Sequence, residues 1–150
     1  MDLSSALSIK TTEIERPSIL PAGIYRAAVK GPPKQEKRKE YEILEFTMQI
    51  IEPIDGVDMD ALRAYGTIGP QTTLRQSFLF NGADQANFDR SLFYLKQFLT
   101  KSLGIEDNGQ ALKELILASN GRQCQVQVRW RPDPQDPEIQ YAEIGKSAAI

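Results

Sequence analysis

Two segments with strict alternation of apolar and polar residues limit this chain to a fold built on β-strands. The apolar positions are Leu44, Phe46, Met48 and Ile50 within residues 41–52, and Cys124, Val126, Val128 and Trp130 within residues 122–131. Successive side chains of a strand point to opposite faces, so a period of two predicts one buried face and one solvated face. Each segment therefore contributes a row of apolar side chains to a core.

Turn residues divide much of the remaining chain into three further strands. We expect strands at residues 24–30, 72–80 and 139–144, because Gly, Pro or Asn-Gly bound these segments. Gly31-Pro32-Pro33 ends the first of them, since proline cannot donate a hydrogen bond to a sheet ladder. The charged residues 34–40 that follow are expected to form a loop.

A helical segment separates the third and fourth predicted strands. Apolar side chains recur at helical spacing after Phe88, and Gly104 suits a helix C-terminus. The pattern predicts one helix over residues 88–104, with Asp84 or Asn87 as its N-cap. Shorter helices are expected near residues 110–119 and 59–65.

Three strands, a helical segment and two strands together predict a β-rich α+β fold. A five-stranded OB-like antiparallel barrel with the helical insertion between strands 3 and 4 has this order, and an open antiparallel sheet packed by a helix is the alternative. The 150 residues suffice for one domain. We expect a single OB-like domain at residues 20–150, preceded by a flexible N-terminal arm at residues 1–19 that is polar and interrupted by Pro17.

The residue types that the chain lacks argue against catalysis. It has no histidine, and Cys124 is its single cysteine. The usual zinc, copper and iron ligand sets and the Ser-His and Cys-His nucleophile pairs cannot be assembled without them. We therefore expect no enzyme activity, no cofactor and no metal site. A Mg²⁺-dependent nuclease that uses carboxylates such as Glu42, Glu45 and Asp55 is the remaining catalytic alternative.

The apolar segments are too short for a membrane protein. No apolar run approaches the roughly 20 residues that span a bilayer. Residues 1–10 also lack the basic start and the apolar stretch of a secretory signal. We expect a cytoplasmic protein without membrane contact.

Positive charge is concentrated in one segment of an otherwise acidic chain. Residues 26–41 hold six basic and two acidic side chains, a net charge of +4, whereas the whole chain carries −2. Such a segment favours contact with an anionic partner. In OB-folds the loop between strands 1 and 2 flanks the oligonucleotide groove, so phosphate contacts are expected there. A solvated loop whose lysines keep the hairpin soluble is the alternative.

The predicted fourth strand supplies a second basic element, with Arg129 and Arg131 on its polar face. Single-stranded nucleic acid is bound by basic grooves with aromatic rings on which bases stack. Trp130 falls on the same face of the strand as Cys124, Val126 and Val128. This favours a core position for its side chain unless the strand twists or bulges near Pro132. Further aromatic candidates are Tyr25, Tyr41 and Phe78. The nucleic-acid-binding residues expected from the sequence are Arg26, Lys30, Lys34, Lys37, Arg38, Lys39, Arg75, Arg129, Trp130 and Arg131.

Four features of the sequence carry a resemblance to a known group: the segment Leu20-Pro21-Ala22-Gly23-Ile24-Tyr25, the basic hairpin, the strand at residues 44–50 and the helix at residues 88–104. Together they resemble phage replication-module proteins. That group comprises small OB-fold single-stranded-DNA-binding proteins and their uncharacterised relatives, and the likeness covers the layout of residues 20–145. The resemblance implies binding of single-stranded DNA without catalysis, in bacteriophage DNA replication or recombination in the host cell cytoplasm. Many such proteins end in an acidic tail that recruits partners, whereas this chain ends in a nearly uncharged segment.

Partners compatible with this role are single-stranded DNA, other replication or recombination proteins, and further copies of the chain in a homo-oligomer. The alternative function is a protein-interaction module, such as a phage assembly factor or an inhibitor of a host enzyme. An ordered N-terminal arm and an exposed apolar patch would be typical of that class.

Overall fold

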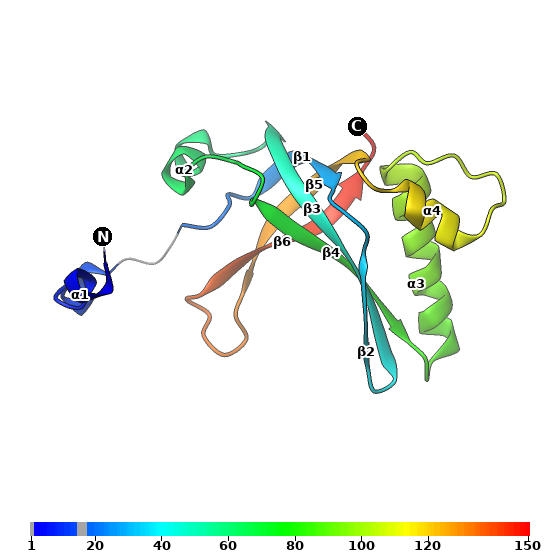
Figure 1. Ribbon diagram of the computed structural model, residues 1–150, viewed down its shortest axis with the longest axis horizontal. Helices are drawn as coiled ribbons and strands as arrows, with labels where there is room; N and C mark the ends of the chain where they lie inside the picture. Colours follow the sequence, from blue (N-terminus) through cyan, green and yellow to red (C-terminus); the bar gives the residue numbers. More distant parts are fainter. Residues whose placement is uncertain (1, 15–17) are drawn as a thin grey trace.

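Six antiparallel strands form one curved sheet in the computed structural model, which describes residues 2–14 and 18–150 (Figure 1). The strands are β1 (Gly23–Val29), β2 (Lys34–Arg38), β3 (Tyr41–Asp55), β4 (Thr73–Asn81), β5 (Gln123–Pro132) and β6 (Gln140–Ala148). Their order is β2-β3-β1-β5-β6, and β4 pairs with β3. The expected β-rich α+β fold with a helical insertion is confirmed.

The long strand β3 organises the sheet because it pairs with three other strands. Its residues 41–45 pair with β2, and its residues 48–55 pair with β1. β4 pairs with residues 41–49 and therefore lies along the opposite edge of β3. β1 and β2 thus follow each other along one edge, separated by Gly31-Pro32-Pro33, and β5 and β6 continue the sheet beyond β1.

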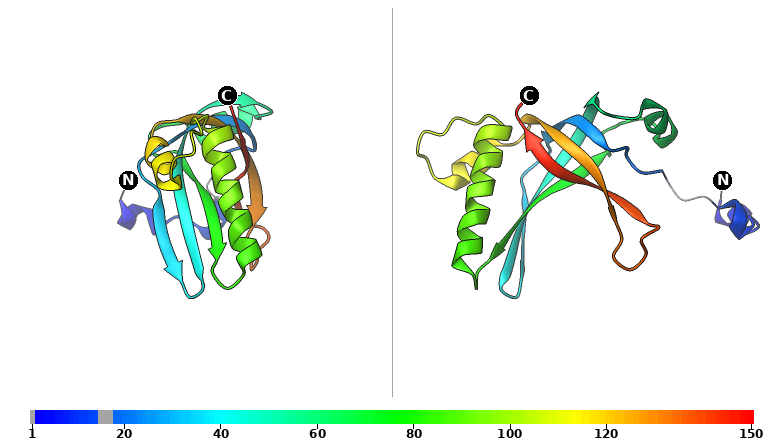
Figure 2. Two further views of the ribbon diagram at one scale, coloured as in Figure 1. Left: turned by 90° about the vertical axis from the view of Figure 1, so that its right-hand side faces the viewer. Right: turned by 180° about the vertical axis from the view of Figure 1, so that it is seen from behind.

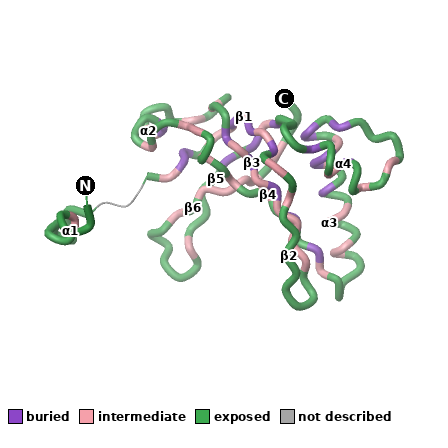
Figure 3. Tube along the Cα trace, viewed as in Figure 1, coloured by how far each residue is buried: buried purple, intermediate pink, exposed green. Residues whose placement is uncertain are grey.

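The apolar faces of the strands meet in one core. Tyr25, Phe46 and Val126 are fully buried, as the alternation of their strands predicts. The rings of Phe46, Phe78 and Phe98 pack together with centroid separations of 5.2–6.0 Å. This core is formed by β1, β3, β4 and β5 together with the helical segment between β4 and β5, and Figure 3 shows buried residues in the strands and in that segment.

The helix α3 (Gln85–Gln97) and the π-helical turn η2 (Phe98–Ser102) lie beside β4 (Figure 1). Asp84 caps α3, because its carboxylate accepts a hydrogen bond from the Asn87 N–H at 3.1 Å. Gly104 has a φ of 68°, the left-handed conformation that ends helices favourably. The predicted helix and its two ends are therefore confirmed. The shorter helices are α2 (Met59–Tyr65) and α4 (Leu112–Ala118), close to their expected positions.

Two expectations about the sheet are wrong. Residues 34–40, expected to be a loop, form strand β2 and the turn into β3. This segment contains no apolar residue and so shows no alternation, but its pairing with residues 41–45 gives it a strand ladder. The sheet therefore has six strands rather than five. No ladder joins β4 to β6 among the described residues, so hydrogen bonds do not close the sheet into a barrel.

Two hairpins extend beyond the core on the same side of the molecule (Figures 1 and 2). The β2–β3 hairpin comprises residues 34–45, and the β5–β6 hairpin comprises residues 129–143. β1 accompanies β5 only as far as Val128, so the rest of β5 has only β6 beside it. The hairpin residues are mostly exposed (Figure 3). Side chains on both faces of these hairpins can therefore reach solvent.

The expected arm at residues 1–19 is described in part. Residues 1 and 15–17, including Pro17, lie outside the described residues. Residues 2–14 contain the short helix α1 (Leu3–Ala6) and the 3₁₀ turn η1 (Thr11–Glu13), and none of them is buried. Within the described ranges, no helix has the length and apolar character needed to cross a membrane.

Candidate nucleic-acid interface

The β2–β3 hairpin carries a dense group of positive charges. A two-residue turn of Lys39 and Glu40 joins Arg38 to its ladder partner Tyr41, and Lys39 has a φ of 54°. The exposed side chains of Lys34, Lys37 and Lys39 form no ion pair with any residue that the structure describes. Three ammonium groups on this hairpin can therefore bind an anion without first losing a carboxylate partner.

Two arginines near this hairpin are already paired. The Arg38 Nε lies 2.9 Å from the Glu36 Oε1, and the Arg75 Nε lies 3.4 Å from the Glu45 Oε1. Exposed ion pairs of this kind contribute about 0.2–1 kcal/mol, so a phosphate can replace either carboxylate at small cost. The surface is nevertheless less positive in the free protein than its arginines alone suggest.

Trp130 lies on the surface, so the favoured expectation of a core position is wrong. Its parity is that of Val126 and Val128, as predicted, but the core ends at Val128, the last β5 residue beside β1. Trp130 pairs with Ala142 in the hairpin extension and is 48% exposed. Its indole N–H donates to the Leu20 carbonyl oxygen at 2.8 Å, which fixes the ring by its edge. Part of the ring surface is thus held open to a ligand.

An apolar groove of about 640 Å³ adjoins Trp130. Ile19, Ile139 and Tyr141 line it together with Trp130, so it lies between the chain that enters β1 and the β5–β6 hairpin. Its volume falls within the roughly 300–1,000 Å³ of small-molecule sites. An aromatic wall of this kind suits a flat ring such as a nucleobase.

The polar face of the β5–β6 hairpin holds Arg129 and Arg131, as predicted. Their Nε atoms lie 2.9 and 3.0 Å from the two carboxylate oxygens of Glu143. One carboxylate thus faces two guanidinium groups, and the Asp133 carboxylate also interacts with Arg131. Tyr141 lies directly opposite Arg131 in the ladder and is also exposed. This face therefore combines an aromatic ring with two guanidinium groups that carboxylates already accompany.

Asp133 orders the turn at the end of this hairpin. Its Oδ1 accepts hydrogen bonds from the N–H groups of Gln135 at 2.8 Å and Asp136 at 3.2 Å. Its Oδ2 accepts the Tyr141 hydroxyl at 2.9 Å. The bond from Gln135 and then the bond from Tyr141 lower the pKa of Asp133, and the same carboxylate raises the pKa of Tyr141. The Tyr141 ring is therefore anchored beside Arg131.

Arg26 and Lys30 make contacts within the body of the sheet. The Arg26 Nε lies 2.9 Å from the Glu52 Oε1, and its Nη1 donates to the Gln123 Oε1 at 3.2 Å. The Lys30 Nζ donates to the Pro70 carbonyl oxygen at 3.0 Å. Both side chains are on the solvent side of the sheet, as predicted, but they do not belong to either hairpin extension.

Of the other aromatic candidates, Tyr41 is exposed and two are buried. The Tyr25 hydroxyl donates to the Pro21 carbonyl oxygen at 2.7 Å inside the core, and burial raises its pKa to about 12. Phe78 belongs to the buried aromatic cluster. Tyr25 and Phe78 cannot stack on a base in this conformation. Trp130, Tyr41 and the unpredicted Tyr141 remain as accessible rings.

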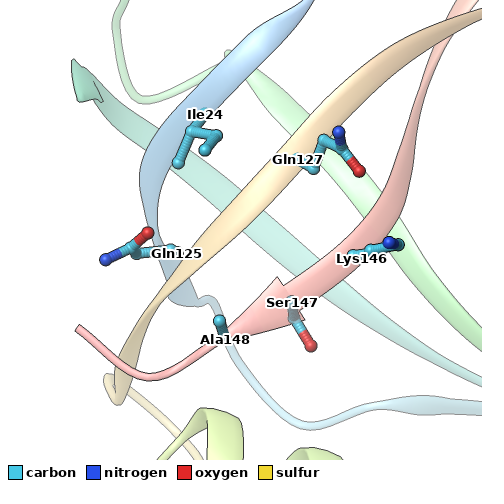
Figure 4. Close-up of a pocket in the computed structure, with 6 residues that line it drawn as sticks. All are labelled: Ile24, Gln125, Gln127, Lys146, Ser147 and Ala148. Carbon is cyan, nitrogen blue, oxygen red and sulfur yellow. The ribbon is translucent and has the colours of Figure 1, made fainter. Parts of the chain in front are cut away.

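A shallower hollow of about 250 Å³ lies on the outer face of β1, β5 and β6 (Figure 4). Ile24, Gln125, Gln127 and Lys146 are among its lining residues. Gln127 and Lys146 are ladder partners on neighbouring strands. These amides and this ammonium group continue the polar face of the β5–β6 hairpin along the body of β5.

The surface includes residues that were not predicted, among them Ile139, Tyr141 and Lys146. Pairing across the β5–β6 turn would have placed Tyr141 opposite Arg131, but a turn with three prolines does not fix the register of the strands on either side. The last strand was expected to end at residue 144, whereas β6 continues to Ala148. Lys146 was therefore left out of the sheet.

Comparisons with known proteins assign no family to the chain. No family model matches it, and no curated protein matches it significantly. The candidate interface is therefore described from its own geometry.

Proposed function

We propose that this protein binds single-stranded DNA without catalysis, on an OB-like barrel that is open along one side. The connectivity supports this fold assignment: β1, β3 and β4 precede α3, β5 and β6 follow it, and β2 extends the line of β1. β4 and β6, which would close such a barrel, are in contact without a ladder. OB-folds bind oligonucleotides on the second and third strands, between two flanking loops. The corresponding elements here are β3, β4 and the two hairpins.

The two hairpins would supply different interactions with DNA: charged contacts to the phosphates and stacking on the bases. The lysines of the β2–β3 hairpin would neutralise phosphates and release counterions from the DNA. Arg38, Arg75, Arg129 and Arg131 would exchange their carboxylate partners for phosphates. Trp130 and Tyr141 would stack on bases, a contact that every base can make and that needs no particular sequence.

The observation that carries the proposal is Trp130, a half-exposed indole held rigidly on a hairpin whose other face bears two arginines. The N–H bond to the Leu20 carbonyl oxygen holds the indole in place, and this fixed edge reduces the entropy lost when a base stacks on the exposed part of the ring. The lysine-bearing hairpin projects on the same side of the molecule (Figures 1 and 2). Positive charge and an accessible ring are thus both available on that side of the molecule, on two separate hairpins.

The resemblance of residues 20–145 to phage single-stranded-DNA-binding proteins supports a biological setting for this activity. We place the proposed binding in bacteriophage DNA replication or recombination, in the cytoplasm of the host. Other replication proteins and further copies of this chain are the partners that this setting would supply.

The test is a titration of a fluorescein-labelled oligo(dT) of about 20 nucleotides, followed by fluorescence anisotropy at several salt concentrations. We expect the logarithm of the binding constant to fall linearly with the logarithm of the salt concentration. The slope should be about −0.7 for each phosphate contact, or roughly −2 for the three unpaired lysines alone. A duplex of the same length should compete weakly. Absence of binding by micromolar protein at low salt would contradict the proposal.

A second candidate function, the protein-interaction module, is favoured by one different observation. Leu3, Leu7 and Ile14 are largely exposed in residues 2–14, and no residue of that segment joins the core. Such a segment suits an apolar groove on a phage assembly protein or a host enzyme. Co-purification of a partner that persists after nuclease treatment and is lost in Leu3→Ser/Leu7→Ser would support this function instead.

A further inference from the structure

The open side of the sheet contains a polar cavity that none of the predicted DNA-binding residues lines. β4 and β6 approach each other there without forming a ladder, and η2 lies against the same place. The cavity has a volume of about 330 Å³, and six of its lining residues are Gln76, Tyr94, Gln97, Lys101, Lys146 and Ser147. It thus draws on β4, α3, η2 and β6.

The charged side chains that line this cavity are both lysines. Among the described residues, Lys101 and Lys146 line it and no carboxylate does, although Asp107 lies beside Lys101 in the adjoining hollow. Neither lysine forms an ion pair with a described residue. The hydroxyl groups of Ser102 and Ser147 lie 2.9 Å apart at the same place and add hydrogen-bonding capacity. Two ammonium groups beside serine hydroxyls are suited to a phosphate.

Gln76 gives the cavity an unused hydrogen-bond acceptor. It stands on the core face of β4 between Leu74 and Phe78, opposite Phe46, where the alternation calls for an apolar residue. Its Oε1 is buried and accepts no hydrogen bond from the described residues. A buried carbonyl oxygen without a donor is rare in native proteins and calls for a specific explanation. Because this oxygen is closed off from solvent, the amide must rotate toward the cavity before an N–H group of a ligand can serve as that donor.

Tyr94 supplies an aromatic surface at the rim. Its side chain is 56% exposed on α3, and it lines the cavity together with Gln97, one helical turn further along. The cavity therefore offers a ring, an amide acceptor, two cations and hydroxyl groups. A nucleobase offers a flat face and N–H donors, and its phosphate offers the negative charge.

We propose that this seam cavity binds one nucleotide, with the phosphate at Lys101 and Lys146, the base on Tyr94 and a base N–H donating to Gln76. The inference rests on the proposed function for the source of the nucleotide, which is a unit of the bound DNA strand. Lys146 also lines the hollow on the outer face of β5 and β6 (Figure 4). A DNA strand that follows that face reaches the seam at Lys146.

The test compares three variants with oligo(dT), with dTMP and with inorganic phosphate as probes. Lys101→Ala/Lys146→Ala removes both cations from the one phosphate, and the salt slope for oligo(dT) should become shallower by about 0.7. Tyr94→Ala should weaken oligo(dT) binding by roughly 5- to 150-fold, the range for one stacked base. Lys113→Ala on α4 is the control, and its binding should equal that of the wild type.

Gln76→Met separates a binding role from a structural one. If the amide serves a ligand, the apolar isostere removes an unsatisfied buried group, so the free protein should melt at a higher temperature while oligo(dT) binding weakens. Unchanged binding, whether the melting temperature rises or falls, would overturn the role of Gln76 and with it the base contact. Weaker binding by a variant that is at least as stable as the wild type supports that role, because a loss of folded protein cannot then explain it.

The outcomes separate this inference from the proposed function. Oligo(dT) binding that survives Lys101→Ala/Lys146→Ala and Tyr94→Ala unchanged, yet is lost on removal of the hairpin lysines, would overturn the seam site alone. If calorimetry shows that the wild-type protein binds dTMP but does not bind oligo(dT), the result would support a site for free nucleotides and contradict DNA binding. Equal binding of inorganic phosphate and dTMP would overturn the base contacts.

Discussion

Trp130 is fixed by its indole N–H and leaves part of its ring open to a ligand, so its removal should cost the free energy of one stacked base. Trp130→Ala should weaken oligo(dT) binding by roughly 5- to 150-fold, the loss of about 1–3 kcal/mol for one stacked base. Trp130→Phe keeps a ring and should lose less. Because the chain has one tryptophan, quenching of its intrinsic fluorescence reports the contact directly.

The control for this residue is Leu117→Ala, which removes another exposed apolar side chain, on α4. Its affinity should match that of the wild type. Unquenched fluorescence at saturating oligo(dT), with Trp130→Ala binding normally, would show that bases do not stack on this ring.

The backbone conformation and the close neighbours of Gly23 require a glycine at this position. Its φ is 145°, and a Cβ there would lie 2.5 Å from the Val57 Cγ2 and 3.0 Å from the Gly56 carbonyl group. Gly23→Ala should therefore lower the free energy of unfolding by about 1–3 kcal/mol. Gly69→Ala, where no atom lies within 4 Å of the added carbon, should change it by less than about 0.5 kcal/mol. Urea denaturation of the two variants, followed by circular dichroism, measures the difference, and equal stabilities would contradict this account of β1.

The β2–β3 hairpin is the element in which charge can be changed without changing the fold. The variant Lys34→Ala/Lys37→Ala/Lys39→Asn uses Asn at the turn because Lys39 has a positive φ, which Asn tolerates. The salt slope for oligo(dT) binding should become shallower by about 2, since three phosphate contacts are lost. Stability should change by less than about 0.5 kcal/mol for each site, because all three side chains are exposed.

A matched variant controls for net charge. Arg63→Ala/Arg90→Ala/Lys113→Ala also removes three positive charges, but from α2, α3 and α4. If anisotropy titrations give the same slope for both triple variants, the whole-protein field rather than the hairpin attracts the DNA, and the local site is wrong.

At the scale of elements, alternation predicts which segments are strands but does not show where the core ends. The parity of Trp130 was predictable, whereas its exposure depends on β1 stopping at the level of Val128. The residues of β2 carry no apolar pattern at all, so only their tertiary pairing with β3 reveals a strand. The π-helical turn η2 likewise continues α3 without a distinct sequence pattern. The arginines were predicted as surface residues, but the carboxylate partners of Arg75, Arg129 and Arg131 lie on neighbouring strands and follow from a register that alternation alone does not fix.

For the whole molecule, one consequence of the buried core concerns stability at high pH. Burial raises the pKa of the Cys124 thiol to about 12, from its ordinary value of 9.0. It also raises the pKa of the Tyr25 hydroxyl to about 12, from 10.0. The unfolded chain therefore releases these two protons at a lower pH than the folded protein does. Their contribution to stability is complete below about pH 9 and is lost as the pH rises through 9 toward 12.

We expect the free energy of unfolding, measured by urea denaturation at fixed salt, to decline progressively above pH 9. The thiol alone sets a limiting slope of about 1.4 kcal/mol per pH unit, since the unfolded state then carries one proton less than the folded state. Cys124→Ala removes this group, so its stability should fall less steeply between pH 9 and pH 10, whatever the cost of the smaller side chain at neutral pH. The thiol should also resist iodoacetamide in the native protein and react once urea unfolds it, because Cys124 is fully buried. Two results would contradict this account: parallel pH profiles for wild type and Cys124→Ala, or rapid alkylation without denaturant. Either would mean that solvent reaches the Cys124 side chain, so that the strands around it do not form the buried core from which both hairpins extend.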